Sequence, residues 1–228
     1  VVRHAGVPAQ CRHHYSRLAR GRAASLTTNG MYDYRRLTAA ERTELLATRR
    51  RAGFPLHAPP HFPDGSRLYL ITAACYEHTA MLATAARRKA FETELLERLT
   101  LESGADIRAW VILPNHYHLL ALVDLSRLRE TLRLVHSACA ARWNKEDEAP
   151  GRRVWYRFAD RAIRSDGHYW ATINYIHANP VRHGHAARAD AWEASSMGRY
   201  LEQHGRDAMA AQWKAHPVLD YGKGWDEP

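Results

Sequence analysis

The stretch "WVILPNHYHLLALV", from Trp110 to Val123, sets His116 and His118 one residue apart within an otherwise apolar run. Alternate side chains of a β-strand project from the same face of its sheet. A strand here would therefore hold both imidazoles side by side, where they could bind one metal ion. Tyr117, which lies between them, would point to the opposite face.

The segments around this run predict a regular order of strands and helices. Apolar alternation predicts strands at 67–75, 106–114 and 152–163, in addition to the one that begins at His116. Apolar residues spaced by three or four predict helices at 79–103 and 125–145. The order βαββαβ is that of the ferredoxin-like or RRM-like fold, an α+β class with an antiparallel sheet and helices on one face.

A further helix is predicted in "SDGHYWATINYIHANP", residues 165–180, after the predicted sheet. Ser165 or Asp166 is a suitable N-cap, and Pro180 is expected to end the helix. One stripe of this helix should face the core, and a second stripe lies about 80° round from it. The core stripe consists of Tyr169, Ile173 and Ile176, and the second stripe of His168, Thr172, Tyr175 and Asn179. We expect His177 to lie at the surface.

Tyr175 and Asn179 lie one turn apart on the second stripe, and together with the two histidines they suit phosphodiester chemistry. A tyrosine hydroxyl has a pKa near 10 and is a poor nucleophile at neutral pH. A divalent metal ion on a non-bridging phosphate oxygen neutralises charge and orients an in-line attack. The two imidazoles and the Asn179 carbonyl oxygen would form a mixed site that suits Mn²⁺ or Zn²⁺ well and Mg²⁺ less well.

Two motifs in this order carry a family resemblance. "LPNHYHLL" (113–120) followed by "NYIHANPVRHG" (174–184) resembles the HUH-type single-tyrosine transposases. Within that group it is most similar to the REP-associated tyrosine transposases. "VWYRFADRAIRS" (154–165) is similar to the segment that precedes their tyrosine helix. The resemblance covers roughly residues 67–200.

The resemblance implies a metal-dependent single-stranded DNA endonuclease and strand transferase that acts near hairpins of repetitive extragenic palindromes. It implies that His116 and His118 are metal ligands and that Tyr175 is the nucleophile, which becomes linked to a 5′ phosphate. Asn179 occupies the position of the third ligand, which is often Gln in the broader family. The expected cofactor is Mg²⁺ or Mn²⁺, and the expected process is DNA transposition and recombination.

The charge of the chain favours a polyanionic partner. The 228 residues include 33 Lys and Arg against 24 Asp and Glu, a formal net charge of +9. Such an excess most often indicates nucleic acid. A solvated face explains any one arginine of the second half, but a strip along a DNA backbone better explains the group. The predicted DNA contacts are Arg133, Arg157, Arg161, Arg164 and Arg182.

The remaining expectations concern organisation and cellular context. We expect a disordered or mis-assigned leader at 1–30, a helix and Pro-rich loop at 31–66, the catalytic domain at 67–185, and a tail at 186–228 that wraps the core with little regular structure. Three scattered cysteines suggest a reducing cytoplasm. No apolar run approaches the roughly 18 residues of a membrane span, so we expect no membrane partner, and either a monomer or a homodimer.

Two other classes of function stay open at this point. One is a catalytically silent protein that binds single-stranded or hairpin nucleic acid with an RRM-like sheet. The other is a small metallohydrolase that uses the histidine pair without forming a covalent intermediate. Tyr175 argues against the silent binding protein, whereas the metallohydrolase would act without forming a protein–DNA adduct.

Overall fold

The computed structural model describes residues 66–219 and Tyr221, together with four isolated positions, Thr38, Ala40, Thr43 and Ala47. The chain forms two compact units, Val1–Asp64 and Gly65–Pro228. The predicted leader, and most of the predicted helix and Pro-rich loop of 31–66, lie outside the described residues.

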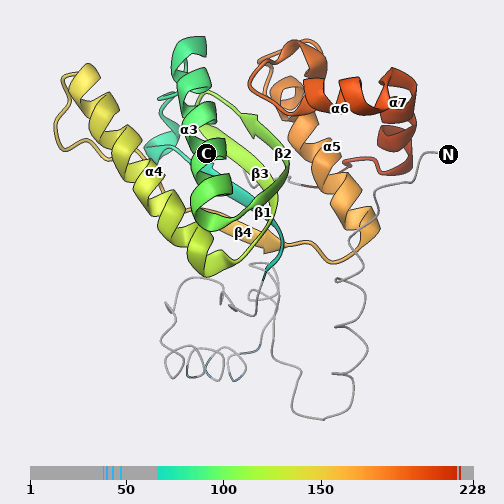
Figure 1. Ribbon diagram of the computed structural model, residues 1–228, viewed down its shortest axis with the longest axis horizontal. Coiled ribbons are helices and arrows are strands. Elements are labelled where there is room, and N and C mark those ends of the chain that lie inside the picture. Colours follow the sequence, from blue (N-terminus) through green and yellow to red (C-terminus); the bar gives the residue numbers. More distant parts are fainter. Residues whose placement is uncertain are drawn as a thin grey trace. The chain divides into compact units, whose positions relative to one another are not determined.

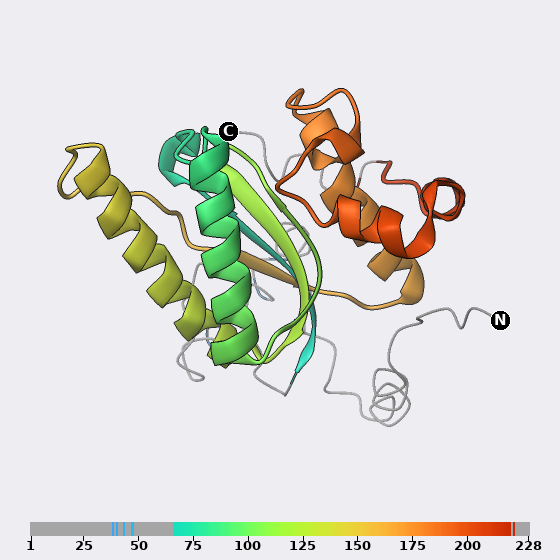
Figure 2. The same cartoon turned by 45° about the horizontal axis from the view of Figure 1, so that its top comes forward.

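The second unit contains the predicted order of elements. It runs through β1 (Arg67–Ala74), the short helix η2 (Tyr76–His78), α3 (Ala85–Ser103), β2 (Asp106–Ile112), β3 (His116–Val123), α4 (Leu125–Glu146), β4 (Ala159–Ala162) and α5 (Asp166–Arg182). The strands form one antiparallel sheet in the order β2-β3-β1-β4. Helices α3 and α4 cover one face of this sheet, and α5 lies on the other (Figures 1 and 2). The predicted ferredoxin-like α+β fold is confirmed.

The caps of the two long helices follow from single residues. The Thr84 side chain accepts a hydrogen bond from the Arg87 backbone N–H at the start of α3, and Asp124 caps α4 in the same way. Gly104 ends α3 in the left-handed conformation, at φ 67°, which glycine adopts without a steric penalty.

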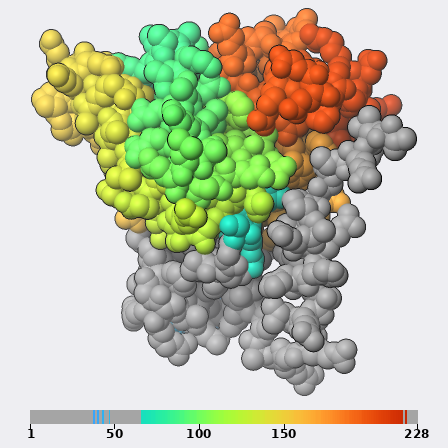
Figure 3. Space-filling model, in the orientation of Figure 1, coloured from blue at the N-terminus to red at the C-terminus, as the bar shows by residue number. Residues whose placement is uncertain are grey.

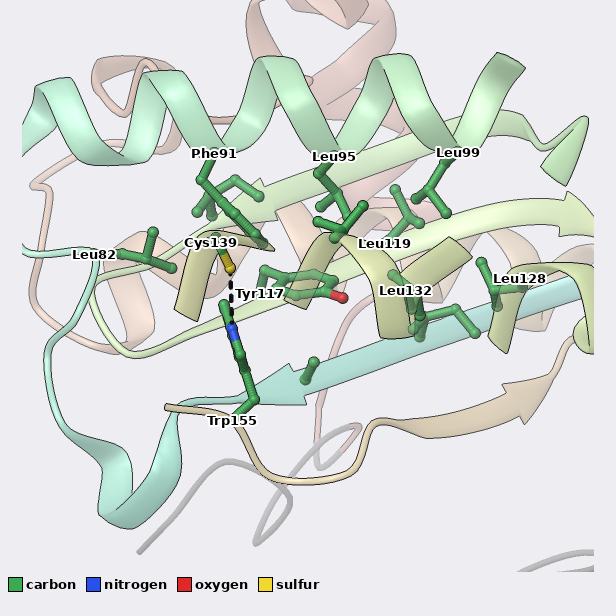
Figure 4. Close-up of a cluster of buried hydrophobic side chains, with 14 of the residues drawn as sticks. Leu82, Phe91, Leu95, Leu99, Tyr117, Leu119, Leu128, Leu132, Cys139 and Trp155 are labelled. Carbon is green, nitrogen blue, oxygen red and sulfur yellow. Dashed lines mark hydrogen bonds between the residues drawn. The ribbon is translucent and has the colours of Figure 1, made fainter. Parts of the chain in front are cut away.

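The first core layer lies between these two helices and the sheet. Figure 4 shows side chains from α3 and α4 meeting Tyr117 and Leu119 of β3. Tyr117 is fully buried, and its hydroxyl lies 3.0 Å from Nε2 of His136. Burial raises the pKa of Tyr117 well above its usual value. The expectation that Tyr117 points away from the two histidines is confirmed, and this phenol is unsuited to act as the nucleophile.

The edge strand β4 is shorter than the predicted segment 152–163. Ala159 pairs with Thr72 of β1, whereas Trp155 pairs with Cys75. Between these two pairs lie two residues of β1 and three residues of the partner segment, so one extra residue interrupts the ladder as a β-bulge does. The pairing resumes at Trp155, whose indole N–H lies 3.2 Å from the Cys139 sulfur inside the core (Figure 4).

Helix α5 does not end at Pro180, as the sequence suggested, but continues to Arg182. A proline in the last turn removes only one backbone donor of the helix. The turn is completed around it, because the backbone N–H of His183 donates to Asn179 O at 3.0 Å and that of His185 to Pro180 O at 2.8 Å.

The segment after α5 is more regular than predicted. It contains the short helix η3 (Ala189–Ala191) and two α-helices, α6 (Met197–His204) and α7 (Arg206–Ala215). Figure 3 shows these C-terminal helices in orange and red at the surface, next to the green atoms, with the yellow end of α4 on the opposite side of the green. Among the described residues no helix is both long enough and apolar enough to cross a bilayer.

The packing of α3 predicts a contrast between two of its residues. Phe91 is fully buried, whereas Leu101 is 74% exposed. Phe91→Ala should lower the free energy of unfolding by about 3–5 kcal/mol, because it leaves a cavity in the core. Leu101→Ala should change it by less than about 0.5 kcal/mol. Urea denaturation of both variants measures the difference; equal effects would contradict this core.

Candidate active site

The two histidines of β3 lie side by side on the face opposite Tyr117. His116 and His118 are both buried, and their ring centroids are 5.0 Å apart. Antiparallel pairing sets Ala74 and Thr72 of β1 directly opposite them. The structure thus brings together the pair that the alternation of the sequence predicted.

Each imidazole is held at Nδ1 by an oxygen atom. Nδ1 of His116 lies 2.7 Å from Asn115 Oδ1, and Nδ1 of His118 lies 2.8 Å from Thr72 Oγ1. An amide oxygen can only accept, so Nδ1 of His116 donates and the lone pair of this ring is on Nε2. The Thr72 hydroxyl can donate or accept, so the second ring has the same tautomer when its Nδ1 donates to Thr72. Histidines that bind metals are usually oriented by such a bond from the other ring nitrogen.

Tyr175 reaches this pair from α5. Its hydroxyl lies 3.2 Å from Nε2 of His118, and the two ring centroids are 5.0 Å apart. The Arg182 guanidinium lies 5.5 Å from the centre of the Tyr175 ring. Tyr175 itself is only 1% exposed. The predicted nucleophile, the predicted ligand pair and one predicted DNA contact therefore share one site.

Asn179 lies one helical turn further along α5 and is fully buried. Its Nδ2 donates to the Tyr175 backbone oxygen at 3.1 Å, whereas its Oδ1 accepts no hydrogen bond from the residues that the structure describes. A buried acceptor without a donor is costly, so Oδ1 is a suitable atom to coordinate a cation. The described part of the chain contains no cluster of three or more His, Cys, Asp or Glu able to hold a metal ion. A site with three protein ligands here would need this amide oxygen.

His183 is a neighbour that the sequence reasoning missed. His183 is exposed, and its ring centroid lies 5.1 Å from that of His116. The ring centroid of His185 lies 6.2 Å from that of His183. His183 comes four residues after Asn179, so helical spacing continued past Pro180 would have placed it near the site. Because the helix was expected to end at Pro180, its four-residue spacing was not extended to His183.

Tyr221 is a second missed neighbour. Its hydroxyl lies 2.6 Å from Thr172 Oγ1 and 2.9 Å from Nε2 of His168, and its backbone oxygen accepts a hydrogen bond from Arg182. Its ring centroid is 5.4 Å from that of Tyr175. Burial raises the pKa of Tyr221. No pattern in the sequence marks this contact, because Tyr221 follows α5 by about forty residues.

The predicted DNA-contacting arginines occupy different places. Arg161 lies on β4 and pairs with Leu70 of β1, so its side chain is on the same face of the sheet as the histidine pair. Burial, together with the positive charges of Arg161 and Arg164, lowers the pKa of His168 on α5. Arg157 is exposed just before β4. Arg133 lies instead on α4, in the opposite helical layer, with its guanidinium 2.6 Å from Glu130.

His177 is not at the surface, as the sequence had suggested, but fully buried. Its Nε2 lies 2.9 Å from Ser196 Oγ, and its ring packs 4.9 Å from Tyr200 of α6. Burial lowers the pKa of His177 to about 3, so the ring is neutral at physiological pH. The prediction was wrong because α6 and its N-terminal turn, which cover this side of α5, were not predicted.

Comparison with known proteins supports the family resemblance. No family model matches the chain. A REP-associated tyrosine transposase of Escherichia coli (strain K12) is 29% identical over 126 residues, 52% of this chain and 68% of the relative. A solved structure of a REP-associated tyrosine transposase bound to a REP hairpin matches with a TM-score of 0.52 at 22% identity, over 63% of this chain and 84% of the other. The resemblance predicted from the two motifs is confirmed: in sequence and in fold, this chain is similar to the REP-associated tyrosine transposases.

Proposed function

We propose that this protein is a transposase that binds hairpin DNA and cleaves and rejoins one strand through a covalent bond to Tyr175. The observation that carries the proposal is the Tyr175 hydroxyl, 3.2 Å from Nε2 of His118, at a site shared with His116 and Asn179. The E. coli relative is named as a transposase, and the structural neighbour was solved with a REP hairpin, which supports the same class of reaction and of partner.

The same site has donors that fit a divalent metal ion. Nε2 of His116, Nε2 of His118 and Oδ1 of Asn179 would hold Mn²⁺ or Mg²⁺, and the two nitrogen ligands favour Mn²⁺. When bound, such an ion would polarise a phosphate oxygen and neutralise its charge. The fit rests on the Nδ1 anchors of the imidazoles and on the buried Asn179 oxygen, which has no donor among the described residues.

The covalent step needs no external energy source. The Tyr175 oxygen would attack the phosphorus atom, and the bond from phosphorus to the 3′ oxygen would break. The phenol proton is lost, and the 3′ oxygen leaves as a free hydroxyl once it is protonated. The 5′ phosphate remains on Tyr175 as a phosphodiester, so a 3′ hydroxyl can attack it in turn and rejoin a strand.

Arginines beside the site would hold the DNA backbone. Arg182, next to the Tyr175 ring, would neutralise the scissile phosphate. Arg161 of β4 and Arg164, which lie near His168 of α5, would contact neighbouring phosphates. Arg133 is not part of this proposal, because α4 lies across the sheet from Tyr175. An enzyme that processes chromosomal DNA of a bacterium would work in the cytoplasm.

Metal dependence is the first expected property. Cleavage of a single-stranded hairpin substrate should require Mn²⁺ or Mg²⁺ and should stop in excess chelator. His116→Ala and His118→Ala should each abolish cleavage, because each removes one metal-binding nitrogen, while hairpin affinity measured by a mobility-shift assay changes little. Full cleavage in chelator would rule out the metal site.

The second expected property is a covalent intermediate. A substrate labelled on the 3′ side of the nick, in the fragment whose 5′ phosphate becomes linked to Tyr175, should give a labelled protein band after denaturation. Tyr175→Phe should remove the band and keep the fold and the hairpin affinity, because it deletes one oxygen atom. A metallohydrolase would cleave without a band, and a silent binding protein would not cleave at all. An adduct formed by the Phe variant would identify a different nucleophile.

The third expected property is a salt dependence set by particular arginines. Each phosphate contact releases condensed counterions, so the affinity for DNA should fall steeply as salt rises. Arg161→Ala and Arg164→Ala should each reduce the slope of log affinity against log salt by about one. Arg133→Ala, in the opposite layer, should leave the slope unchanged. The reverse pattern would place the DNA on the α3–α4 side.

A further inference from the structure

An aromatic and cationic cluster lies outside the site described above. We call Tyr76, His78, Arg153 and Tyr156 the tyrosine–arginine cluster. The Arg153 guanidinium lies 4.5 Å from the centre of the Tyr76 ring and 5.5 Å from that of Tyr156. The two tyrosine rings are 5.0 Å apart, and the His78 ring is 6.3 Å from Tyr156. Tyr156 is 38% exposed, so one ring of the cluster is open to solvent.

Strand pairing places this cluster on the catalytic face of the sheet. His116 pairs with Ala74, and the Tyr156 backbone N–H donates to Ala74 O at 2.9 Å, next to the pair of Cys75 with Trp155. Paired residues of antiparallel strands share a face, and neighbouring residues alternate. Trp155 points into the α3–α4 core, so Tyr156 shares the face of Ala74 and His116. Two strand spacings separate Tyr156 from His116, a distance of about 10 Å.

The charge of the cluster is not neutralised within the described part of the chain. Arg153 is exposed and donates to the Trp155 backbone oxygen, and no ion pair joins it to a described carboxylate. Arg152, its neighbour, is by contrast paired with Asp147 at 2.7 Å. The Arg153 guanidinium therefore lies over the tyrosine rings without a described carboxylate beside it, and its positive charge can attract an anionic partner.

The backbone that carries two of these side chains is strained. Within η2, Glu77 and His78 have φ values of 51° and 52°, in the left-handed region that non-glycine residues rarely adopt. No residue of η2 is buried, so packing in a core does not account for this conformation. Strain of this kind is concentrated at sites that bind ligands.

We infer that the tyrosine–arginine cluster binds an unpaired nucleobase of the DNA strand whose phosphate Tyr175 attacks. The inference rests on the proposed function and adds a base-binding position to it. Tyrosine rings offer a stacking surface to any base, and Arg153 adds a cation for the adjoining phosphate. A single strand that passes His116 needs to extend by only about 10 Å, two strand spacings of the sheet, to reach Tyr156, so the bound base lies close to the cleavage position.

The test compares two probes and two substitutions by fluorescence anisotropy. The probes are a hairpin with a single-stranded flank on each side and the same hairpin without flanks. Tyr156→Ala should weaken binding of the flanked hairpin about tenfold, which is within the range measured for base–aromatic stacking. It should leave binding of the bare hairpin within twofold. Tyr156→Phe, which keeps the ring, should bind both probes like the wild type, and Arg98→Ala on α3 serves as a surface control.

Abasic substitutions in the flanks then locate the base. One abasic position should weaken binding to the wild type about tenfold and have no further effect on Tyr156→Ala. If no abasic position depends on Tyr156, or if Tyr156→Ala binds both probes like the wild type, the inference is wrong. Thermal unfolding of each variant checks that the fold is kept; if Tyr156→Ala is unstable, Tyr156→Leu, which also removes the aromatic ring, replaces it with the same expected results. Binding is scored without cleavage, so a failure to form the Tyr175 adduct would count against the proposed function alone.

Discussion

The alternation of side chains along β3 is the constraint on which both the hydrophobic core and the candidate site depend. Tyr117 points into the layer between the sheet and helices α3 and α4, while His116 and His118 point to the other face. Because β3 pairs with both β1 and β2, its register is fixed on two sides. A slip of one residue would bury the two imidazoles in an apolar core and remove the proposed metal ligands from the side of Tyr175. The core and the site are therefore specified by the same eight residues.

The candidate site combines anchored imidazoles with a buried tyrosine, the proposed nucleophile. Asn115 and Thr72 hold the two imidazoles at Nδ1, so the lone pairs on Nε2 are directed to the side where Tyr175 and Asn179 lie. The Tyr175 hydroxyl is almost inaccessible and Tyr221 packs on its ring. Under the proposed function, a scissile phosphate would reach this hydroxyl only after neighbouring side chains move.

The sequence predicted those parts of the structure that rest on local periodicity. Two-residue alternation on β3 and four-residue spacing on α5 were enough to bring His116, His118, Tyr175 and Asn179 together. The βαββαβ order was predicted in the same way. Two expectations about α5 failed, since its last turn accommodates Pro180 and His177 is buried against Ser196.

Long-range contacts could not be predicted in this way. The packing of Tyr221 on Tyr175 joins residues 46 positions apart and has no periodic signal. The sequence also does not indicate on which side of the sheet an arginine lies. Arg133 and Arg161 are both basic residues of the second half, yet they occupy opposite sides of the sheet. Charge composition favours a polyanionic partner, whereas the layer on which each arginine lies is visible only in the fold.

The geometry of the ligand set is the central claim, and the position of a bound metal ion tests it most directly. Crystals of the protein soaked in Mn²⁺ would reveal the ion by its anomalous scattering. The account predicts one strong peak about 2.0–2.3 Å from Nε2 of His116, Nε2 of His118 and Oδ1 of Asn179. A peak bound by His183 and His185 at the surface, with none between the two histidines of β3, would contradict it.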